Sequence, residues 1–199
     1  MNRIGILTVL GVVLAVASMA PAAGLVNGSF ESGLTGWTTS TTGNGSVTAV
    51  SSFENWLPTD GSLFALIKTQ MSSTSPQLLY QTPTLAAGTV ISFDYFFDQD
   101  SLCPAIATIS LGGTTVITVD ANTPPIEGKW VHYVSTPLPS TGAYTIQFGA
   151  QGTSILSLPS SYLGVDNVVA AAPVPEPLTM LAVFSGISGL GVYLRRRRA

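Results

Sequence analysis

The fold class is decided by one stretch of this chain, Ile106-Ala107-Thr108-Ile109-Ser110-Leu111-Gly112-Gly113-Thr114-Thr115-Val116-Ile117-Thr118-Val119. Two runs rich in β-branched residues, which favour strands, flank the pair Gly112-Gly113. Glycine adopts positive φ angles at little steric cost, and the two central residues of a tight hairpin turn need such angles. The stretch therefore predicts a β-hairpin with strands over 106–111 and 114–119.

Strand-like segments separated by turn residues also fill the rest of the chain from Gly24 to Ala172. No segment there keeps a 3.6-residue apolar stripe beyond two turns, which argues against helices, and no internal repeat has a fixed period. We therefore expect one all-β domain, a β-sandwich of about nine strands. Besides the hairpin, the expected strands cover residues 47–53, 63–69, 77–82, 90–98, 130–136, 144–150 and 162–169.

Two of these regions give finer predictions. The run from Val90 to Phe97 alternates only in part between apolar and polar residues, which predicts a central strand with one strongly buried face. The stretch from Thr38 to Ser46 is rich in Ser, Thr and Gly, so we expect a loop or an irregular sheet edge there.

The first 23 residues have the pattern of a secretory signal peptide. Arg3 supplies the positive start, Ile4 to Ala17 form the apolar core, and Ala20-Pro21-Ala22 or the adjacent Ala23 offers small residues for signal peptidase. We expect this segment to be removed after export, and fold reasoning starts near Gly24.

The last segment, residues 173–199, has the pattern of a sorting tail. It begins with a four-residue motif over 174–177, whose two prolines restrict it to extended conformations. An apolar run over 178–194 follows this motif. At about 1.5 Å per residue that run gives a helix of roughly 25 Å, close to the ~30 Å core of a bilayer. A terminal arginine cluster would stay cytoplasmic and leave the body outside. The motif residues are Val174, Pro175, Glu176 and Pro177, and the cluster is Arg195, Arg196, Arg197 and Arg198.

This order of motif, apolar helix and arginine cluster resembles the PEP-CTERM signal of Gram-negative bacteria. The resemblance implies that an exosortase in the inner membrane processes the tail near the motif and releases or attaches the exported domain. The alternative is an ordinary single-pass anchor with a Pro-rich stalk.

The body between the two terminal segments is acidic. It holds Lys68, Lys129 and nine Asp or Glu residues, for a net charge of about −7. Such a charge argues against nucleic acid and anionic lipid as partners. The carboxylates could bind divalent cations, or they could serve only to keep the protein soluble. Cys103 is the only cysteine, so neither an intramolecular disulfide nor a cysteine metal cluster is available.

Both ends of the body carry a family resemblance. The opening run from Leu25 to Glu31, read Leu-Val-Asn-Gly-Ser-Phe-Glu and followed by Gly36-Trp37, is similar to the start of galactose-binding-like and carbohydrate-binding jelly rolls. The run from Tyr162 to Val169, with Asp166-Asn167 at its centre, is similar to their closing strand. The resemblance implies a jelly-roll sandwich in which structural calcium often joins the first strand to the last.

Carried onto this chain, the calcium ligands would be Glu31 and Asp166. Calcium prefers oxygen ligands, and a carboxylate in the apolar run around Asp166 needs a compensating partner. The alternative is an Asp whose oxygens accept hydrogen bonds from backbone groups at a strand end. No other cofactor is expected.

Candidate glycan contacts lie in the polar, Pro-bounded segment from Phe53 to Pro58. Trp56 offers a ring that could stack on a sugar, and Glu54 and Asn55 could hold its hydroxyls. We expect Trp37 and Trp130 to belong to the core instead.

We expect no enzymatic activity. His132, the only histidine, alternates with Trp130 and Val134 on an expected strand and has no nucleophile motif beside it, so a structural role is expected. A glycoside hydrolase would need paired carboxylates, for which Glu54, Asp98 and Asp100 are the candidates.

Together these features predict an exported, non-enzymatic matrix or adhesion protein of the cell surface or of an extracellular polysaccharide matrix. The alternative within the same fold is a carbohydrate-binding module that recognises an extracellular glycan.

Overall fold

The computed structural model describes residues 24–69, 75–98, 105–119, 129–152 and 161–173, and every regular element in these ranges is a β-strand. The expected signal peptide, Asp100, Cys103 and the expected sorting tail from Val174 onward lie outside these ranges. Within them, no helix has the length and apolar character needed to cross a membrane.

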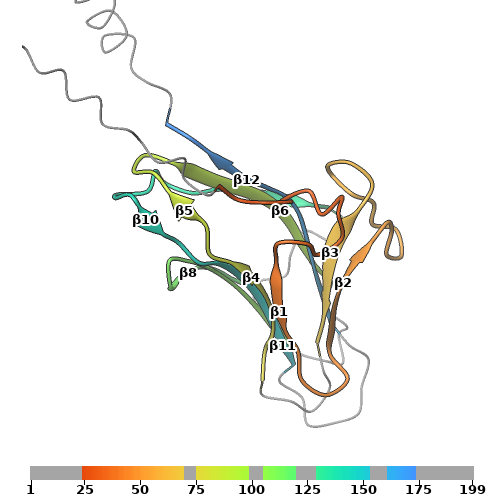
Figure 1. Cartoon of the computed structure of the whole chain (residues 1–199). Coiled ribbons are helices and arrows are strands. Elements are labelled where there is room, and N and C mark those ends of the chain that lie inside the picture. Colours follow the sequence, from red (N-terminus) through yellow and green to blue (C-terminus); the bar gives the residue numbers. More distant parts are fainter. Residues whose placement is uncertain (1–23, 70–74, 99–104, 120–128, 153–160, 174–199) are drawn as a thin grey trace, which may run out of the picture.

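The strands form two five-stranded antiparallel sheets that lie face to face, as Figure 1 shows. The first sheet has the order β1 (Thr38–Ser40), β4 (Gln77–Gln81), β11 (Ile146–Gly152), β7 (Ala105–Leu111) and β8 (Thr114–Val119). The second sheet has the order β2 (Ser46–Val50), β3 (Phe64–Lys68), β12 (Tyr162–Ala171), β6 (Val90–Asp98) and β9 (Val131–Val134). A small ribbon of β5 (Thr84–Leu85) and β10 (Gly142–Ala143) lies at one end.

All nine expected strands are present, and the β-sandwich prediction is confirmed. The hairpin that decides the fold class joins β7 to β8, with φ angles of 59° at Gly112 and 84° at Gly113. The strand expected over 47–53 ends earlier, at Val50, because the chain turns back on itself between Phe53 and Trp56. The stretch from Thr38 to Ser46 contains the short edge strand β1, and the two-residue strands β5 and β10 were not predicted.

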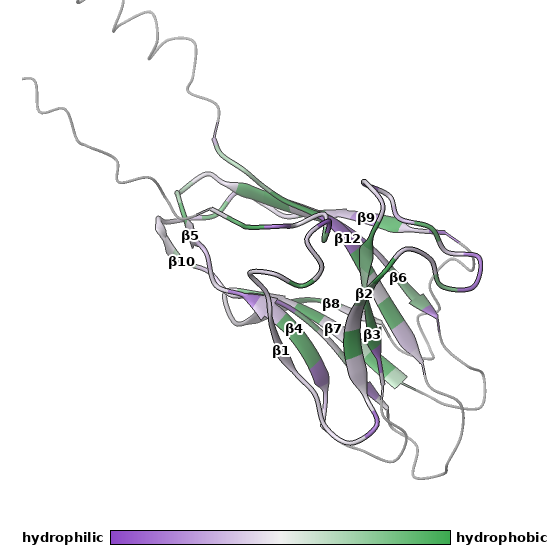
Figure 2. Ribbon diagram, turned by 45° about the vertical axis from the view of Figure 1, so that its right-hand side comes forward, coloured by the Kyte–Doolittle hydropathy of each residue, from purple (hydrophilic) through white to green (hydrophobic). Residues whose placement is uncertain are grey.

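The main core fills the space between the sheets. Apolar residues alternate along the strands of both layers (Figure 2), and the inward-facing ones are fully buried, among them Phe93, Phe148 and Leu163. Trp37 packs against Phe148 and is 8% exposed, so its expected place in the core is confirmed.

A second apolar cluster covers the outer face of the second sheet. Phe64, Leu66 and Phe96 are buried there, although they point away from the main core. The rings of Trp56 and Trp130 cover them, so Trp130 belongs to this outer cluster and not to the main core. This cover explains the partial alternation in β6, which lies between β12 and β9 and is buried on both faces near Phe96.

The N-terminal segment is fixed to the last strand through Asn27 and Gly28. Asn27 has a φ of 52°, and its side chain hydrogen-bonds the backbone of Ser32, Gly33 and Thr35. The Gly28 carbonyl accepts a hydrogen bond of 2.9 Å from the Val168 amide, which is free because β12 has a bulge between Asp166 and Val169. These contacts place the opening motif beside the closing strand.

Candidate functional site

The predicted glycan contacts Trp56, Glu54 and Asn55 share one tight turn. Phe53 and Trp56 exchange two backbone hydrogen bonds, and Glu54 and Asn55 form the exposed tip. The Trp56 ring stacks on Phe96 with 3.9 Å between centroids and 6° between planes. Because one face of the Trp56 ring packs on Phe96, at most its other face is free for a sugar, and glycan contact at this turn stays a prediction.

The carboxylates weighed for hydrolysis are partly gathered near Tyr162. Burial raises the pKa of the Tyr162 hydroxyl, and the negative charges of Glu54 and Asp98 raise it further. Glu54 and Asp98 therefore lie on the same side of the domain, while Asp100 lies outside the described residues.

The two predicted calcium ligands, Glu31 and Asp166, accept hydrogen bonds from backbone amides of the same loop. Glu31 Oε1 accepts hydrogen bonds from the amides of Ser62 and Leu63, at 2.7 and 2.8 Å. Asp166 Oδ2 accepts from the amides of Thr59 and Asp60, at 2.7 and 3.0 Å. We call residues 59–63 the clamped loop.

These contacts do not fit a calcium ion at Asp166. Asp166 Oδ2 also receives the Thr59 hydroxyl, and Oδ1 receives the Asn167 amide at 2.7 Å, so N–H and O–H donors surround the group. A cation would have to displace these donors from the oxygens it needs. Among the described residues, no three His, Cys, Asp or Glu side chains lie close enough together to hold a metal ion. The geometry instead matches the alternative prediction, in which the oxygens of Asp166 accept hydrogen bonds from backbone amides.

A second carboxylate, Asp94, lies directly opposite Asp166 on the neighbouring strand β6. Two facing carboxylates repel each other, and Thr59 separates them: its hydroxyl lies 2.7 Å from Asp94 Oδ2 and 3.1 Å from Asp166 Oδ2. Asn167 donates its side-chain amide to Asp94, and His132 Nδ1 lies 2.6 Å from Asp94 Oδ1. His132 thus pairs with this carboxylate, and the structural role expected for it stays a prediction. No local sequence pattern predicts this position of Thr59.

The two carboxylates differ in pKa. Burial would raise the pKa of Asp94, but the hydrogen bonds from His132, Thr59 and Asn167, with the charge of His132, together lower it below 3.8. For Asp166 burial outweighs its hydrogen bonds and raises the pKa. The charged form of Asp94 is thus stabilised by folding, and that of Asp166 is not.

This difference predicts the pH dependence of an Asp94→Asn variant. Because the pKa of Asp94 is lower in the folded state, its charge stabilises the fold above its unfolded pKa, and this contribution is lost as the pH falls through the folded pKa. Near pH 6 the variant should lose about 1.5–3 kcal/mol of unfolding free energy, the value of hydrogen bonds to a charged group. Near pH 3 the difference from the wild type should shrink.

Urea unfolding of both proteins at the two pH values checks this prediction. Asp166 titrates in the opposite sense, but it is present in both proteins and largely cancels in the difference. A difference that stays constant between the two pH values would contradict the role assigned to Asp94.

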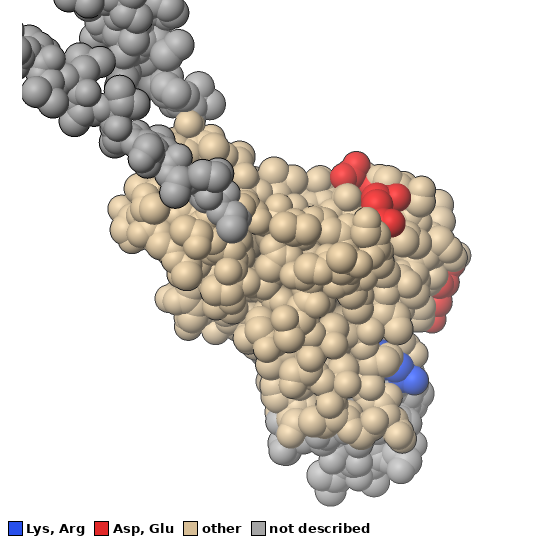
Figure 3. Space-filling model, in the orientation of Figure 1, with Lys and Arg blue, Asp and Glu red and all other residues tan. Residues whose placement is uncertain are grey.

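The outer face of the first sheet has no charge. Its five strands contain no Asp, Glu, Lys, Arg or His, whereas the second sheet carries all the charged or ionisable strand residues of these types: Lys68, Asp94, Asp98, His132 and Asp166. In Figure 3 the acidic atoms lie toward the loops between β2 and β3, and the visible surface over β4, β8 and β10 is uncharged.

A polar row crosses this face from edge to edge. Strand register places its members directly opposite one another, one from each strand, at intervals of about 4.8 Å. Within the described residues, neither the Tyr80 hydroxyl nor the Gln147 amide has a hydrogen-bond partner, and both side chains are half-buried. Of the two aromatic residues on the strands of this sheet, Phe148 faces the core, so Tyr80 is the aromatic of the outer face. The polar row is Thr38, Tyr80, Gln147, Ser110 and Thr115.

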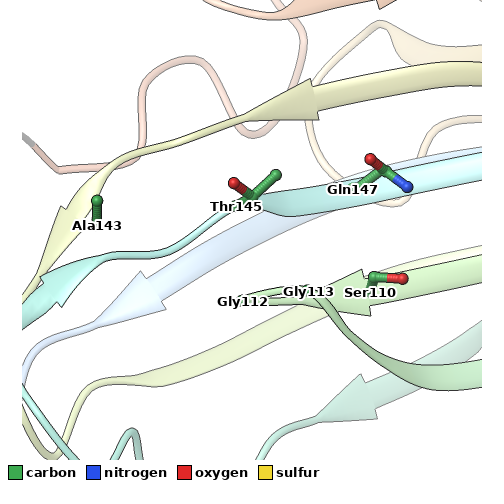
Figure 4. Close-up of a pocket in the computed structure, with 6 residues that line it drawn as sticks. All are labelled: Ser110, Gly112, Gly113, Ala143, Thr145 and Gln147. Carbon is green, nitrogen blue, oxygen red and sulfur yellow. The ribbon is translucent and has the colours of Figure 1, made fainter.

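A hollow of about 440 Å³ opens beside this row, within the usual range of ligand pockets. Ser110 and Gln147 belong to both the row and the hollow, and Figure 4 shows them on neighbouring strands. The hairpin tip is held there because the Gly112 amide donates to the Thr145 carbonyl at 2.8 Å. The hairpin turn at Gly112 and Gly113 thus forms a fixed wall of the hollow. Its lining is Ser110, Gly112, Gly113, Ala143, Thr145 and Gln147.

Sequence reasoning missed the polar row. Strand alternation could have placed Tyr80 and Gln147 on an outer face, because each lies next to a buried residue, but only the strand order makes them neighbours. Absence of charge over residues 77–93, 105–119 and 133–152 is a signal that the sequence does carry.

Solved structures with this fold include several carbohydrate-binding modules. A module solved in complex with β-1,4-galactotriose superposes with a TM-score of 0.54 at 15% identity, covering 77% of this chain and 99% of that one. A second module, from a study of promiscuous specificity in the β-sandwich superfamily, gives 0.52 at 16% identity, over 76% of this chain and 63% of that one. A cleaved adhesin domain of Lys-gingipain from Porphyromonas gingivalis gives 0.51 at 15% identity, over 75% and 99%.

These likenesses define the class of fold: a β-sandwich of the kind found in carbohydrate-binding modules and in an adhesin domain. Neither a protein-family model nor a curated protein sequence matches the chain.

Proposed function

We propose that this protein is a non-enzymatic glycan-binding protein and that the polar row and its hollow are the binding site. The observation that carries the proposal is the Gln147 amide, which has no hydrogen-bond partner among the described residues and lies beside Tyr80 on an uncharged face that ends in a hollow. An aromatic ring packs against the apolar face of a sugar, and an amide both donates to and accepts from its hydroxyls. The shared fold of carbohydrate-binding modules supports this proposal over a purely structural role.

We also propose, from the sequence alone, where the protein acts. The signal peptide would export it, and the tail that resembles a PEP-CTERM signal would deliver it to an exosortase at the inner membrane. The glycan would then be an extracellular polysaccharide, and binding would serve an adhesive or matrix role.

Replacing Tyr80 with alanine tests the site. The full-length protein, purified in a neutral detergent, should lose affinity for its glycan about tenfold or more, because a central aromatic anchor is removed. The unfolding midpoint should change little, since Tyr80 lies outside the main core. Calorimetric titration of a panel of soluble polysaccharides measures the affinity, and Tyr80→Phe, which keeps the ring, is the matched control.

Trp56→Ala separates this site from the turn predicted from sequence. Loss of the ring stacked on Phe96 should reduce the unfolding free energy by about 3 kcal/mol, with the affinity of the folded fraction unchanged. If Trp56→Ala abolishes binding and Tyr80→Ala does not, the glycan binds at the turn and the proposed site is wrong.

A further inference from the structure

The uncharged face also bears on the class of glycan. We infer that the polar row and hollow select neutral polysaccharides and reject polymers that carry carboxylate or sulfate groups. This inference rests on the proposed function and adds the ligand's charge to it.

Among the described residues, this face has no positive charge to pair with an acidic sugar. An acidic sugar in the hollow would lose part of its hydration, and such a loss is offset in proteins by a paired cation. The lining offers hydroxyl, amide and backbone groups but no Lys, Arg or His. The two described lysines lie elsewhere: Lys68 is on β3 of the second sheet, and Lys129 immediately precedes Trp130 of the outer aromatic cluster.

The whole body between the terminal segments carries a net charge of about −7. A field of this sign slows the approach of an anionic polymer at low salt and does not act on a neutral one. An acidic body alone would favour cationic glycans, but the lining has no carboxylate to hold an ammonium group.

The polar groups of the hollow also suit a neutral sugar better than an acidic one. The Gln147 amide has two N–H donors and a carbonyl acceptor, and the Ser110 hydroxyl both donates and accepts. Within the part of the chain that the structure describes, Ser110 Oγ has one long contact, 3.4 Å to Thr115 Oγ1, so it remains available to a ligand. Sugar hydroxyls are likewise both donors and acceptors, so they can use every one of these groups, whereas a carboxylate only accepts and can use the Gln147 N–H donors but not its carbonyl.

Matched polymers test the inference on the full-length protein. β-1,4-Galactan, mannan, xylan and a mixed-linkage glucan are titrated, each beside its own carboxymethylated derivative. The best neutral binder should lose about tenfold or more in affinity on carboxymethylation. The affinity for the unmodified neutral polymer should change less than about twofold between low and high salt, because no ion pair forms.

A Gln147→Lys variant reverses the expected selectivity. The added cation should narrow the gap between the neutral polymer and its carboxymethylated form by about tenfold and make the charged complex salt-dependent. Ser110→Lys is a second variant at the same hollow, in case the first does not fold, and unfolding midpoints show whether each folds.

The outcomes separate the two proposals. Equal or tighter binding of a carboxymethylated polymer, lost in Tyr80→Ala, overturns the inference and leaves the proposed function standing. If neither form of any polymer binds while the protein is folded, the proposed function fails and the inference falls with it.

Discussion

Gly28→Ala is expected to destabilise the domain by more than about 3 kcal/mol, which places it among the largest effects of a single substitution. A Cβ at this position would lie 1.8 Å from the Val168 carbonyl oxygen and 2.9 Å from its carbon. These are backbone atoms, so no rotamer change relieves the clash. The N-terminal segment would have to separate from β12, and the hydrogen bond from the Val168 amide to Gly28 would break.

That separation would also expose part of the main core. Phe30, two residues further on, is fully buried and packs against Trp37 with 5.3 Å between ring centroids. Burial of one such ring contributes about 1.5–3 kcal/mol, so a partial loss adds to the cost of the broken backbone contact. Urea unfolding near pH 7, followed by tryptophan fluorescence, measures the effect.

Gly142→Ala is the matched control. A Cβ there has no atom within 4 Å, and Gly142 does not have a positive φ angle, so a change within about 0.5 kcal/mol is expected. Similar losses in the two variants would show that the contact between Gly28 and Val168 is not what fixes the N-terminal segment.

The contact at Gly28 also explains why the two ends of the body were readable from sequence. The opening motif requires Asn27 because this residue has a left-handed backbone conformation. It requires Gly28 because the Val168 backbone lies too close for a side chain at that position. The closing strand needs Asp166 and Asn167 because the bulge at Asn167, with a φ of 50°, frees the Val168 amide. Such backbone requirements restrict residue type strongly, so they leave a recognisable local pattern.

Strand positions were predictable for a similar reason, since alternation and turn residues act within one segment. Every expected strand was found, and β1 lies in the stretch expected to be a loop or an irregular sheet edge. The strands that were missed are β5 and β10, each too short to show a period. The role of Trp56 could not be predicted, because its exposure depends on Phe96, which lies far away in sequence and faces outward. A polar, Pro-bounded loop predicts an exposed ring only if no apolar patch lies beneath it.

The polar row could not be predicted for the same reason, because it depends on contacts between segments far apart in the sequence. Its five members come from five strands in the order β1, β4, β11, β7 and β8, which no local pattern specifies. The pairing of Asp94 with Asp166 depends likewise on the register of β6 against β12. Local sequence therefore determined the strands, while the candidate site and the buried carboxylates arise from their order.

Asp166→Ala is the second substitution with a large expected effect, a loss of about 3–5 kcal/mol of unfolding free energy. Asp166 is fully buried and accepts hydrogen bonds from the amides of Thr59, Asp60 and Asn167. Removing it leaves three backbone donors without their acceptor, and each unsatisfied donor that stays buried costs about 1–3 kcal/mol. The clamped loop would lose its hydrogen bonds to the buried carboxylate and keep those to Glu31. Urea unfolding of the full-length protein measures the loss.

Glu31→Ala isolates the contribution of burial, because Glu31 holds the same loop through two amides but is exposed. Water replaces its carboxylate, so a loss of no more than about 1 kcal/mol is expected. The pair also tests how the loop is held. If amides hold it, as the hydrogen bonds indicate, millimolar calcium or a chelator leaves the wild-type unfolding midpoint unchanged. A midpoint that rises with calcium, and that no longer does so in Asp166→Ala, would instead mean that a cation displaces the Thr59 and Asp60 amides from this carboxylate.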